Sequence, residues 1–157
     1  MTRRADNPGV IAPPPLIYLA FLLAGWGADR LLDLPGLGLE TDVRRGLAFV
    51  LIIGGLLLDW IAAGHFRRLG TAVEPWKAST ALATGGLYRL SRNPIYVGFA
   101  VTYLGFAIAM DSLVAAAFLL PCLLVVDRFV IQREERYLAA KFGAEYEAYR
   151  ARVRRWL

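Results

Sequence analysis

The chain has 157 residues, enough for one domain, and 57% of them are hydrophobic, against about 45–50% in soluble globular proteins. The mean hydropathy of +0.47 excludes a disordered protein and favours a protein that resides in lipid. The chain has one cysteine, Cys122, which excludes a disulfide framework. With one histidine, His65, beside that cysteine, we expect no metal site of the usual His/Cys type.

The hydropathy pattern divides the chain into a tail and four apolar blocks. Residues 1–15 form the tail, which ends in three consecutive prolines that mark the start of a helix. The blocks predict membrane spans at about 16–34, 46–63, 94–110 and 112–131, although a span needs roughly 20 residues and the third is short. We therefore expect an all-α fold, a bundle of four transmembrane helices in which residues 16–157 form one domain.

The first apolar block has two interpretations, a secretory signal peptide or an uncleaved membrane span. Basic residues precede an apolar core, as in a secretory signal peptide, and such a segment would be removed. However, the core is long, prolines precede it, and no clear cleavage site follows. These features favour an uncleaved first span.

The basic residues are distributed unevenly between the two ends of the predicted bundle. Fifteen of the 18 Lys and Arg residues fall in the tail, in the connection between spans two and three, or after span four. Because basic residues gather on the cytoplasmic side, this distribution places both termini and that connection in the cytoplasm. It also explains the net charge of +5 by membrane topology and anionic lipid, so we expect the lipid bilayer, and no nucleic acid, as a partner.

Two cytoplasmic segments are candidates for function. The connection from Gly64 to Tyr96 is too long and too patterned for a simple linker, although a solvated basic loop at the membrane surface would share its composition. After span four, we expect an amphipathic helix at about 132–156, with a possible interruption at Gly143. Its apolar face repeats at helical spacing and comprises Leu138, Phe142, Tyr146, Tyr149, Val153 and Trp156.

Glu134 and Glu135 follow directly from the fourth span. Adjacent side chains on a helix point about 100° apart, so these acids do not form a paired general acid and base. A partly desolvated carboxylate at this place needs a cation or hydrogen-bond donors. One alternative is a salt bridge to Arg128, Arg133 or Arg136, and the other is contact with a ligand.

An ordered set of motifs in the second half of the chain resembles a known superfamily. Residues 79–98 read STALATGGLYRLSRNPIYVG, an apolar hairpin follows, and residues 134–153 read EERYLAAKFGAEYEAYRARV. This set is similar to the isoprenylcysteine carboxyl methyltransferase and phospholipid N-methyltransferase superfamily over about residues 64–157. The resemblance implies a membrane methyltransferase, in a bacterial inner membrane, that uses S-adenosyl-L-methionine as cofactor and methylates a lipophilic acceptor at the cytoplasmic face.

The resemblance also implies roles for individual residues. Cofactor contacts are implied for two short runs, two glutamates and a tyrosine, namely Thr80, Ala81, Leu82, Ala83, Tyr88, Asn93, Pro94, Ile95, Tyr96, Glu134 and Glu135. Catalytic or substrate-side roles are implied for Asn93, Tyr96 and Arg133. Acids suit an amine or ribose hydroxyls, and aromatic rings suit adenine or a sulfonium.

One departure from the motif leaves the acceptor open. Carboxyl methyltransferases of the superfamily carry His where this chain has Asn93, and Asn cannot titrate. We therefore expect Asn93 to orient a ligand and not to transfer a proton. An isoprenylcysteine carboxylate, a phospholipid amine and a small thiol all stay open as acceptors. Two rival functions are a membrane reductase of the related sterol reductase type and a non-catalytic membrane protein of the same fold.

Overall fold

The computed structural model describes residues 7–74 and 76–157, and every regular element among them is helical. Three helices, α1 (Pro14–Leu32), α2 (Thr41–Arg68) and α3 (Pro94–Ala109), are uninterrupted, and a 3₁₀ turn, η1 (Gly86–Arg89), precedes α3. The remaining elements follow closely on one another. They are α4 (Leu113–Ala117), α5 (Leu119–Val126), the π-helical turn η2 (Asp127–Ile131), α6 (Gln132–Phe142) and α7 (Ala144–Arg152).

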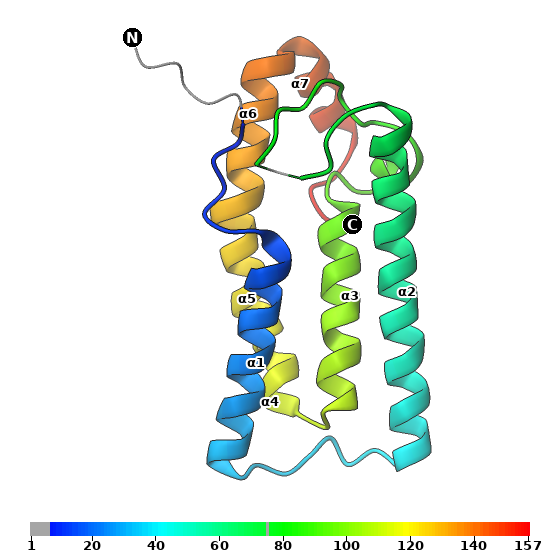
Figure 1. Ribbon diagram of the computed structural model, residues 1–157, viewed down its shortest axis with the longest axis vertical. Coiled ribbons are helices and arrows are strands. Elements are labelled where there is room, and N and C mark those ends of the chain that lie inside the picture. The colour runs from blue at the N-terminus through cyan, green and yellow to red at the C-terminus, as the bar shows by residue number, and fades with distance from the viewer. Residues whose placement is uncertain (1–6, 75) are drawn as a thin grey trace.

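The helices form an elongated bundle (Figure 1). α3 packs between α1 and α2, and α4 and α5 pack against α1. One end of the bundle, which we call the α7 end, carries α7, the loop of residues 69–93 and the start of α3 (Figure 1). The opposite end carries the connection between α1 and α2 and the turn between α3 and α4 (Figure 1).

Three helical stretches are long and apolar enough to cross a membrane: Pro14–Leu32, Thr41–Arg68 and Leu113–Phe142. This confirms the prediction of an all-helical membrane-type protein for the described residues. α3 is also apolar, but it has only 16 residues. Such a helix is about 24 Å long, whereas the hydrocarbon core of a bilayer is about 30 Å thick. The fourth span therefore stays a prediction.

The helix bounds differ from the predicted spans where polar residues continue a helix. α1 starts within the triple proline and α3 starts at Pro94, as the sequence indicates. α2 is longer than the predicted 46–63 at both ends, because its first turn includes Asp42 and its last includes Arg67 and Arg68. Hydropathy detects the apolar part of a helix, and it does not detect charged turns beyond that part.

The predicted boundary at residue 131, between a fourth span at 112–131 and a C-terminal helix at 132–156, does not interrupt the helix. The stretch Leu113–Phe142 is instead one 30-residue helical run that changes its winding twice. The first change, at Phe118, lies just before Pro121, which lacks an N–H donor and crowds the preceding turn. The second is η2.

The interruption that the sequence indicates at Gly143 is confirmed, since its φ of 51° and ψ of −125° suit glycine far better than other residues. The C-terminal helix ends at Arg152, short of the predicted residue 156, because Val153 has an extended backbone and the Arg154 carbonyl accepts a hydrogen bond from the Arg92 amide just before α3.

Hydrogen bonds from tyrosines join the helices within the apolar core. The Tyr18 hydroxyl on α1 donates to the Tyr96 carbonyl on α3 at 3.0 Å. The Tyr103 hydroxyl on α3 donates to the Ala115 carbonyl on α4 at 2.8 Å. Each bond satisfies a buried polar group that would otherwise be costly in an apolar environment. Together the two bonds fix the position of α3 along its axis relative to α1 and α4.

A glycine allows α2 and α3 to approach closely. A Cβ atom on Gly55 of α2 would lie 2.6 Å from the Gly98 carbonyl oxygen and 2.7 Å from the Thr102 nitrogen, both in the backbone of α3. Small residues commonly permit such close packing of membrane helices. The neighbouring Gly54 has no such neighbour within 4 Å.

We predict that Gly55→Ala destabilises the protein by about 1–3 kcal/mol, because the added methyl group overpacks a backbone contact. Gly54→Ala is the matched control, and it should be neutral or slightly stabilising since the site is open. Thermal unfolding of the two variants in detergent measures the difference. Equal stability of the two variants would contradict the close contact.

Candidate functional site

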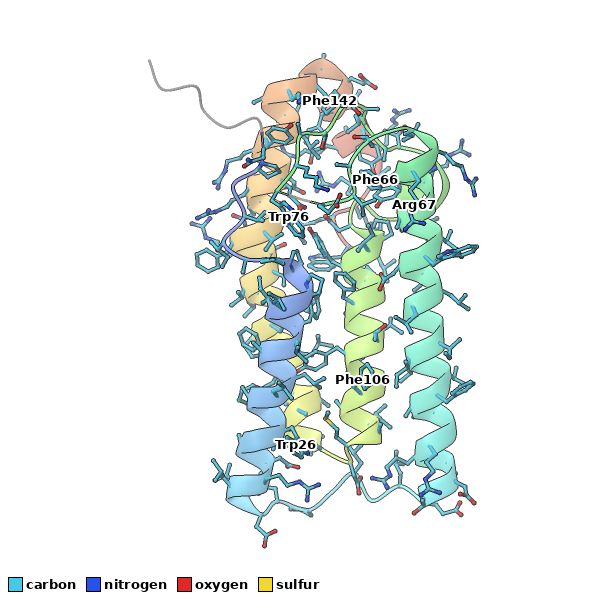
Figure 2. The ribbon with its side chains drawn as sticks, in the orientation of Figure 1. Trp26, Phe66, Arg67, Trp76, Phe106 and Phe142 are labelled. Carbon is cyan, nitrogen blue, oxygen red and sulfur yellow. The ribbon has the colours of Figure 1, made fainter. Side chains whose placement is uncertain are left out.

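A cavity of about 240 Å³ lies at the α7 end of the bundle. Its lining residues come from the segment before α1, the start of α1, α2, the 69–93 loop, α3, α6 and α7. Figure 2 shows Phe66 and Trp76 at this end, far from Trp26 and Phe106 in the opposite half. Aromatic side chains dominate the walls: Phe66, Trp76, Tyr88, Tyr96, Phe99, Tyr137, Tyr146 and Tyr149. The volume is slightly below the range of about 300–1,000 Å³ that is typical of small-molecule sites.

Hydrogen bonds hold the 69–93 loop over the cavity. The Ser79 amide donates to the Tyr137 hydroxyl on α6 at 3.1 Å. The Thr80 amide donates to the Thr71 hydroxyl at 2.9 Å, and the Thr80 hydroxyl donates to the Gly70 carbonyl at 3.2 Å. Thr80 therefore braces the loop and does not line the cavity, whereas the next three residues, 81–83, do.

The turn η1 places Tyr88 in the cavity wall. Its ring stacks on His65 at 5.9 Å between centroids and meets Phe66 edge-on at 5.3 Å. Its carbonyl accepts a 2.7 Å hydrogen bond from the Tyr149 hydroxyl on α7. Burial raises the pKa of the Tyr88 hydroxyl well above its ordinary value, so this group is neutral at physiological pH.

Glu134 on α6 meets Tyr96 on α3 at the cavity. The Tyr96 hydroxyl donates to Glu134 Oε1 at 2.6 Å, which is typical of a charge-assisted bond. Tyr96 is 7% exposed, and both residues line the cavity. The bond therefore connects the start of α3 to the start of α6 across the site.

Glu135 has a different set of partners. Arg155 holds it through two bonds, Nη2 to Oε2 at 2.7 Å and Nε to Oε1 at 3.0 Å, and Arg92 Nη2 lies 3.0 Å from Oε1. Arg155 Nη1 also lies 3.2 Å from Asp127 Oδ1. The bonds to Glu135 raise the pKa of the Arg155 guanidinium above its ordinary value. The adjacent glutamates thus face different partners, and neither pairs with Arg128, Arg133 or Arg136 in the contacts observed.

Asn93 and Arg133 lie in different surroundings. Asn93 lines the cavity, and its Nδ2 donates to the Arg155 carbonyl at 2.9 Å. Arg133 Nη1 donates to the Gly9 carbonyl at 2.6 Å, in the segment before α1. Arg133 does not line the cavity. Pro94 is buried at the first turn of α3, where it starts the helix behind the wall.

Most of the residues named from the sequence converge on this one cavity. Those that line it are Ala81, Leu82, Ala83, Tyr88, Asn93, Ile95, Tyr96, Glu134 and Glu135. Thr80, Pro94 and Arg133 lie outside it.

The sequence did not indicate Phe66, Trp76 and Phe99 in the wall, and it gave Arg92, a residue of the Arg-Asn-Pro motif, no role of its own. Arg92 lies directly before Asn93, and its side chain is 10% exposed. Its Nε and Nη1 are buried without a hydrogen-bond partner among the described residues. An arginine beside the Asn-Pro motif was a signal for this residue, while no local pattern indicated Phe66 or Trp76.

We predict that Glu135→Gln destabilises the ligand-free protein by roughly 3 kcal/mol, because it leaves the mostly buried Arg92 without its carboxylate. The control is Glu147→Gln, which breaks an exposed 3.4 Å pair with Arg150 and should cost at most about 0.5 kcal/mol. Chemical unfolding in detergent tests both variants. Equal effects would show that the Glu135 pairs behave like surface pairs.

Most of the residues that line the cavity lie in a region of the chain that is similar to known proteins. The family model described as phospholipid methyltransferase matches residues 43–145, about two thirds of the chain. The protein-S-isoprenylcysteine O-methyltransferase of Schizosaccharomyces pombe is 40% identical over 75 residues, which cover 46% of this chain and 30% of that enzyme. An uncharacterised protein of Haemophilus influenzae is 57% identical over 35 residues, which cover 22% of this chain and 56% of that protein.

The matches thus span about half the length of the Haemophilus protein and under a third of the yeast enzyme. No solved structure matches the chain. The family match includes α2, the 69–93 loop, α3 and α6, which supply most of the cavity wall. On this match the chain belongs to the phospholipid methyltransferase family.

Proposed function

We propose that the protein transfers a methyl group from S-adenosylmethionine to a lipophilic acceptor in the membrane. The observation that carries the proposal is the convergence of the motif residues on one cavity. Tyr88 lies in η1, Asn93 directly before α3, Tyr96 in α3 and Glu134 in α6, and all four line the cavity. The match to the yeast isoprenylcysteine methyltransferase supports the same chemistry.

The chemical groups in the cavity wall fit this cofactor. S-adenosylmethionine has a cationic sulfonium and ammonium, an anionic carboxylate and an aromatic base. The wall offers the Glu134 carboxylate for a cation or a ribose hydroxyl, and tyrosine faces for the sulfonium or adenine. Arg92, with two buried donors that lack a partner, fits the carboxylate. A wall with a carboxylate, a guanidinium and aromatic rings suits a zwitterionic ligand better than a purely apolar one.

The residues around the cavity would act mainly by alignment. When bound, S-adenosylmethionine would supply an electrophilic methyl group, and its transfer to an acceptor would leave S-adenosylhomocysteine. Tyr96 and Glu134 fix each other through their 2.6 Å hydrogen bond, so the wall is held in one arrangement. The loop residues 81–83 contribute apolar side chains to the cavity wall. Orientation and exclusion of water supply much of the rate in such transfers.

The acceptor would approach from the apolar side of the cavity. The apolar lining includes Pro14 and Pro15 at the start of α1, and Ile95 and Phe99 in the first half of α3. An isoprenylcysteine carboxylate needs no base, whereas a phospholipid amine or a thiol must lose a proton. Asn93 cannot take that proton, so water or Tyr96 with its Glu134 partner would do so.

We propose that four helices cross the membrane and that the α7 end faces the cytoplasm of a bacterial cell. α3 serves as the fourth span, because a bilayer thins locally around a short helix. The uneven distribution of Lys and Arg supports the orientation. The cavity then lies where a soluble cofactor and a lipid-borne acceptor can meet.

We predict that cysteines introduced at Lys77 and at Thr41 label from opposite sides of the membrane. Lys77 lies in the loop at the α7 end, and Thr41 starts α2 at the other end. Cys122 is fully buried, so labelling reports on the introduced residue. Access of an impermeant maleimide to Thr41→Cys but not to Lys77→Cys in intact cells is the expected result. Labelling of both from outside would contradict the orientation.

We predict that the purified protein binds S-adenosylhomocysteine and that Glu134→Gln weakens this binding by about 1.5–3 kcal/mol, the range for a hydrogen bond to a charged group. Glu145→Gln is the control, because Glu145 is an exposed acid on α7 outside the cavity. Titration calorimetry measures the affinities. A companion assay follows the radiolabelled methyl group of S-adenosylmethionine into a lipid extract.

Absence of binding to the wild-type protein would refute the proposed cofactor. Binding without transfer to any lipid fraction would favour a non-catalytic protein of the same fold. Binding of reduced nicotinamide dinucleotide phosphate in place of S-adenosylhomocysteine would favour the reductase alternative.

A further inference from the structure

The chain that follows α7 returns to the motif turn at the start of α3. α7 ends at Arg152, and Val153 has an extended backbone with φ of −121° and ψ of 132°. Figure 1 shows the C-terminus beside the first turn of α3. We call residues 153–157 the C-terminal strap. The family match ends at residue 145, so the strap lies outside the matched region.

Three hydrogen bonds join the strap to the turn. The Arg92 amide donates to the Arg154 carbonyl at 2.9 Å. The Asn93 Nδ2 donates to the Arg155 carbonyl at 2.9 Å, and the Ser91 hydroxyl donates to the same carbonyl at 3.3 Å. The backbone of the strap therefore holds three consecutive residues at the cavity, including the side chain of Asn93.

The side chain of Arg155 extends this contact to a second element. Its guanidinium forms two bonds with the Glu135 carboxylate, at 2.7 Å and 3.0 Å, and also reaches Asp127 in η2 at 3.2 Å. A two-point contact fixes the plane of a carboxylate, which a single cation such as lysine does not do. Glu135 in turn pairs with Arg92 in the cavity wall.

We propose that Arg155 is a positioning residue, which sets the cavity for its ligand by holding Glu135 and the Ser91–Asn93 turn in register. Arg155 does not itself line the cavity, so it acts through residues that do. The inference that this register matters for S-adenosylmethionine rests on the proposed function. The register itself is a property of the ligand-free protein.

The test compares Arg155→Gln with Arg154→Gln. Both changes remove one positive charge from the strap and keep its backbone, but the Arg154 side chain is exposed. Hydrogen–deuterium exchange of a peptide spanning residues 88–97 in the ligand-free protein reports on the turn. We expect faster exchange in Arg155→Gln only. Arg155→Lys, which keeps the charge but loses the two-point contact, should give an intermediate result.

Calorimetry with S-adenosylhomocysteine, at a temperature well below unfolding, tests the consequence for binding. Arg155→Gln should weaken binding about tenfold or more, as loss of an orienting group does elsewhere. A double-mutant cycle with Glu135→Gln separates positioning from independent effects. If Arg155 acts through Glu135, Arg155→Gln should change the affinity of the Glu135→Gln protein much less than that of the wild type.

Two results would overturn the proposal. In the first, Arg155→Gln lowers the melting temperature but leaves both the exchange of the 88–97 peptide and the affinity unchanged, which shows a purely stabilising role. In the second, Arg155→Gln weakens the affinity of the Glu135→Gln protein by the same factor as that of the wild type, which shows that Arg155 does not act through Glu135. If the wild-type protein does not bind S-adenosylhomocysteine, the proposed function fails, and the exchange comparison alone decides whether Arg155 holds the turn.

Discussion

The structure of the α7 end depends on compensating two adjacent carboxylates at the start of α6. Because neighbouring side chains on a helix diverge by about 100°, Glu134 and Glu135 require separate partners. Tyr96 from α3 serves the first, and Arg92 and Arg155 serve the second. These bonds draw together the start of α3, the start of α6 and the chain after α7. The cavity lies where these segments meet, so the charge pairs that hold the fold also shape the site.

The helices below the cavity make this arrangement possible. Gly55 lets α2 lie against the backbone of α3, and the Tyr18 hydroxyl ties α1 to Tyr96. The π-helical turn η2 inserts an extra residue in its turn, which rotates the faces of α6 relative to α5. π-helical turns of this kind are frequent at functional sites. Asp127, the first residue of the turn, contacts Arg155. The π-helical turn is therefore joined directly to the cluster of charged residues around Glu135.

Hydropathy and short motifs predicted much of this structure, and tertiary contacts account for what they missed. Prolines marked the starts of α1 and α3, and Tyr88, Asn93 and Glu134, which the family resemblance indicated, line one cavity. Arg133 and Arg155 look alike in sequence, yet Arg133 binds the Gly9 carbonyl and Arg155 binds Glu135. The partner of each arginine depends on how α6 is rotated and where the chain runs after Gly143. No local sequence pattern predicts either of these.

We propose that the cavity between α3, α6 and the 69–93 loop holds S-adenosylmethionine, and photo-crosslinking of the bound cofactor tests this proposal. Ultraviolet irradiation of the purified protein with methyl-radiolabelled cofactor, followed by peptide mapping, locates the bound ligand. We expect label on peptides from residues 72–99 or 134–149, and loss of that label with excess S-adenosylhomocysteine. Label confined to the opposite end of the bundle, such as the connection between α1 and α2, would contradict it.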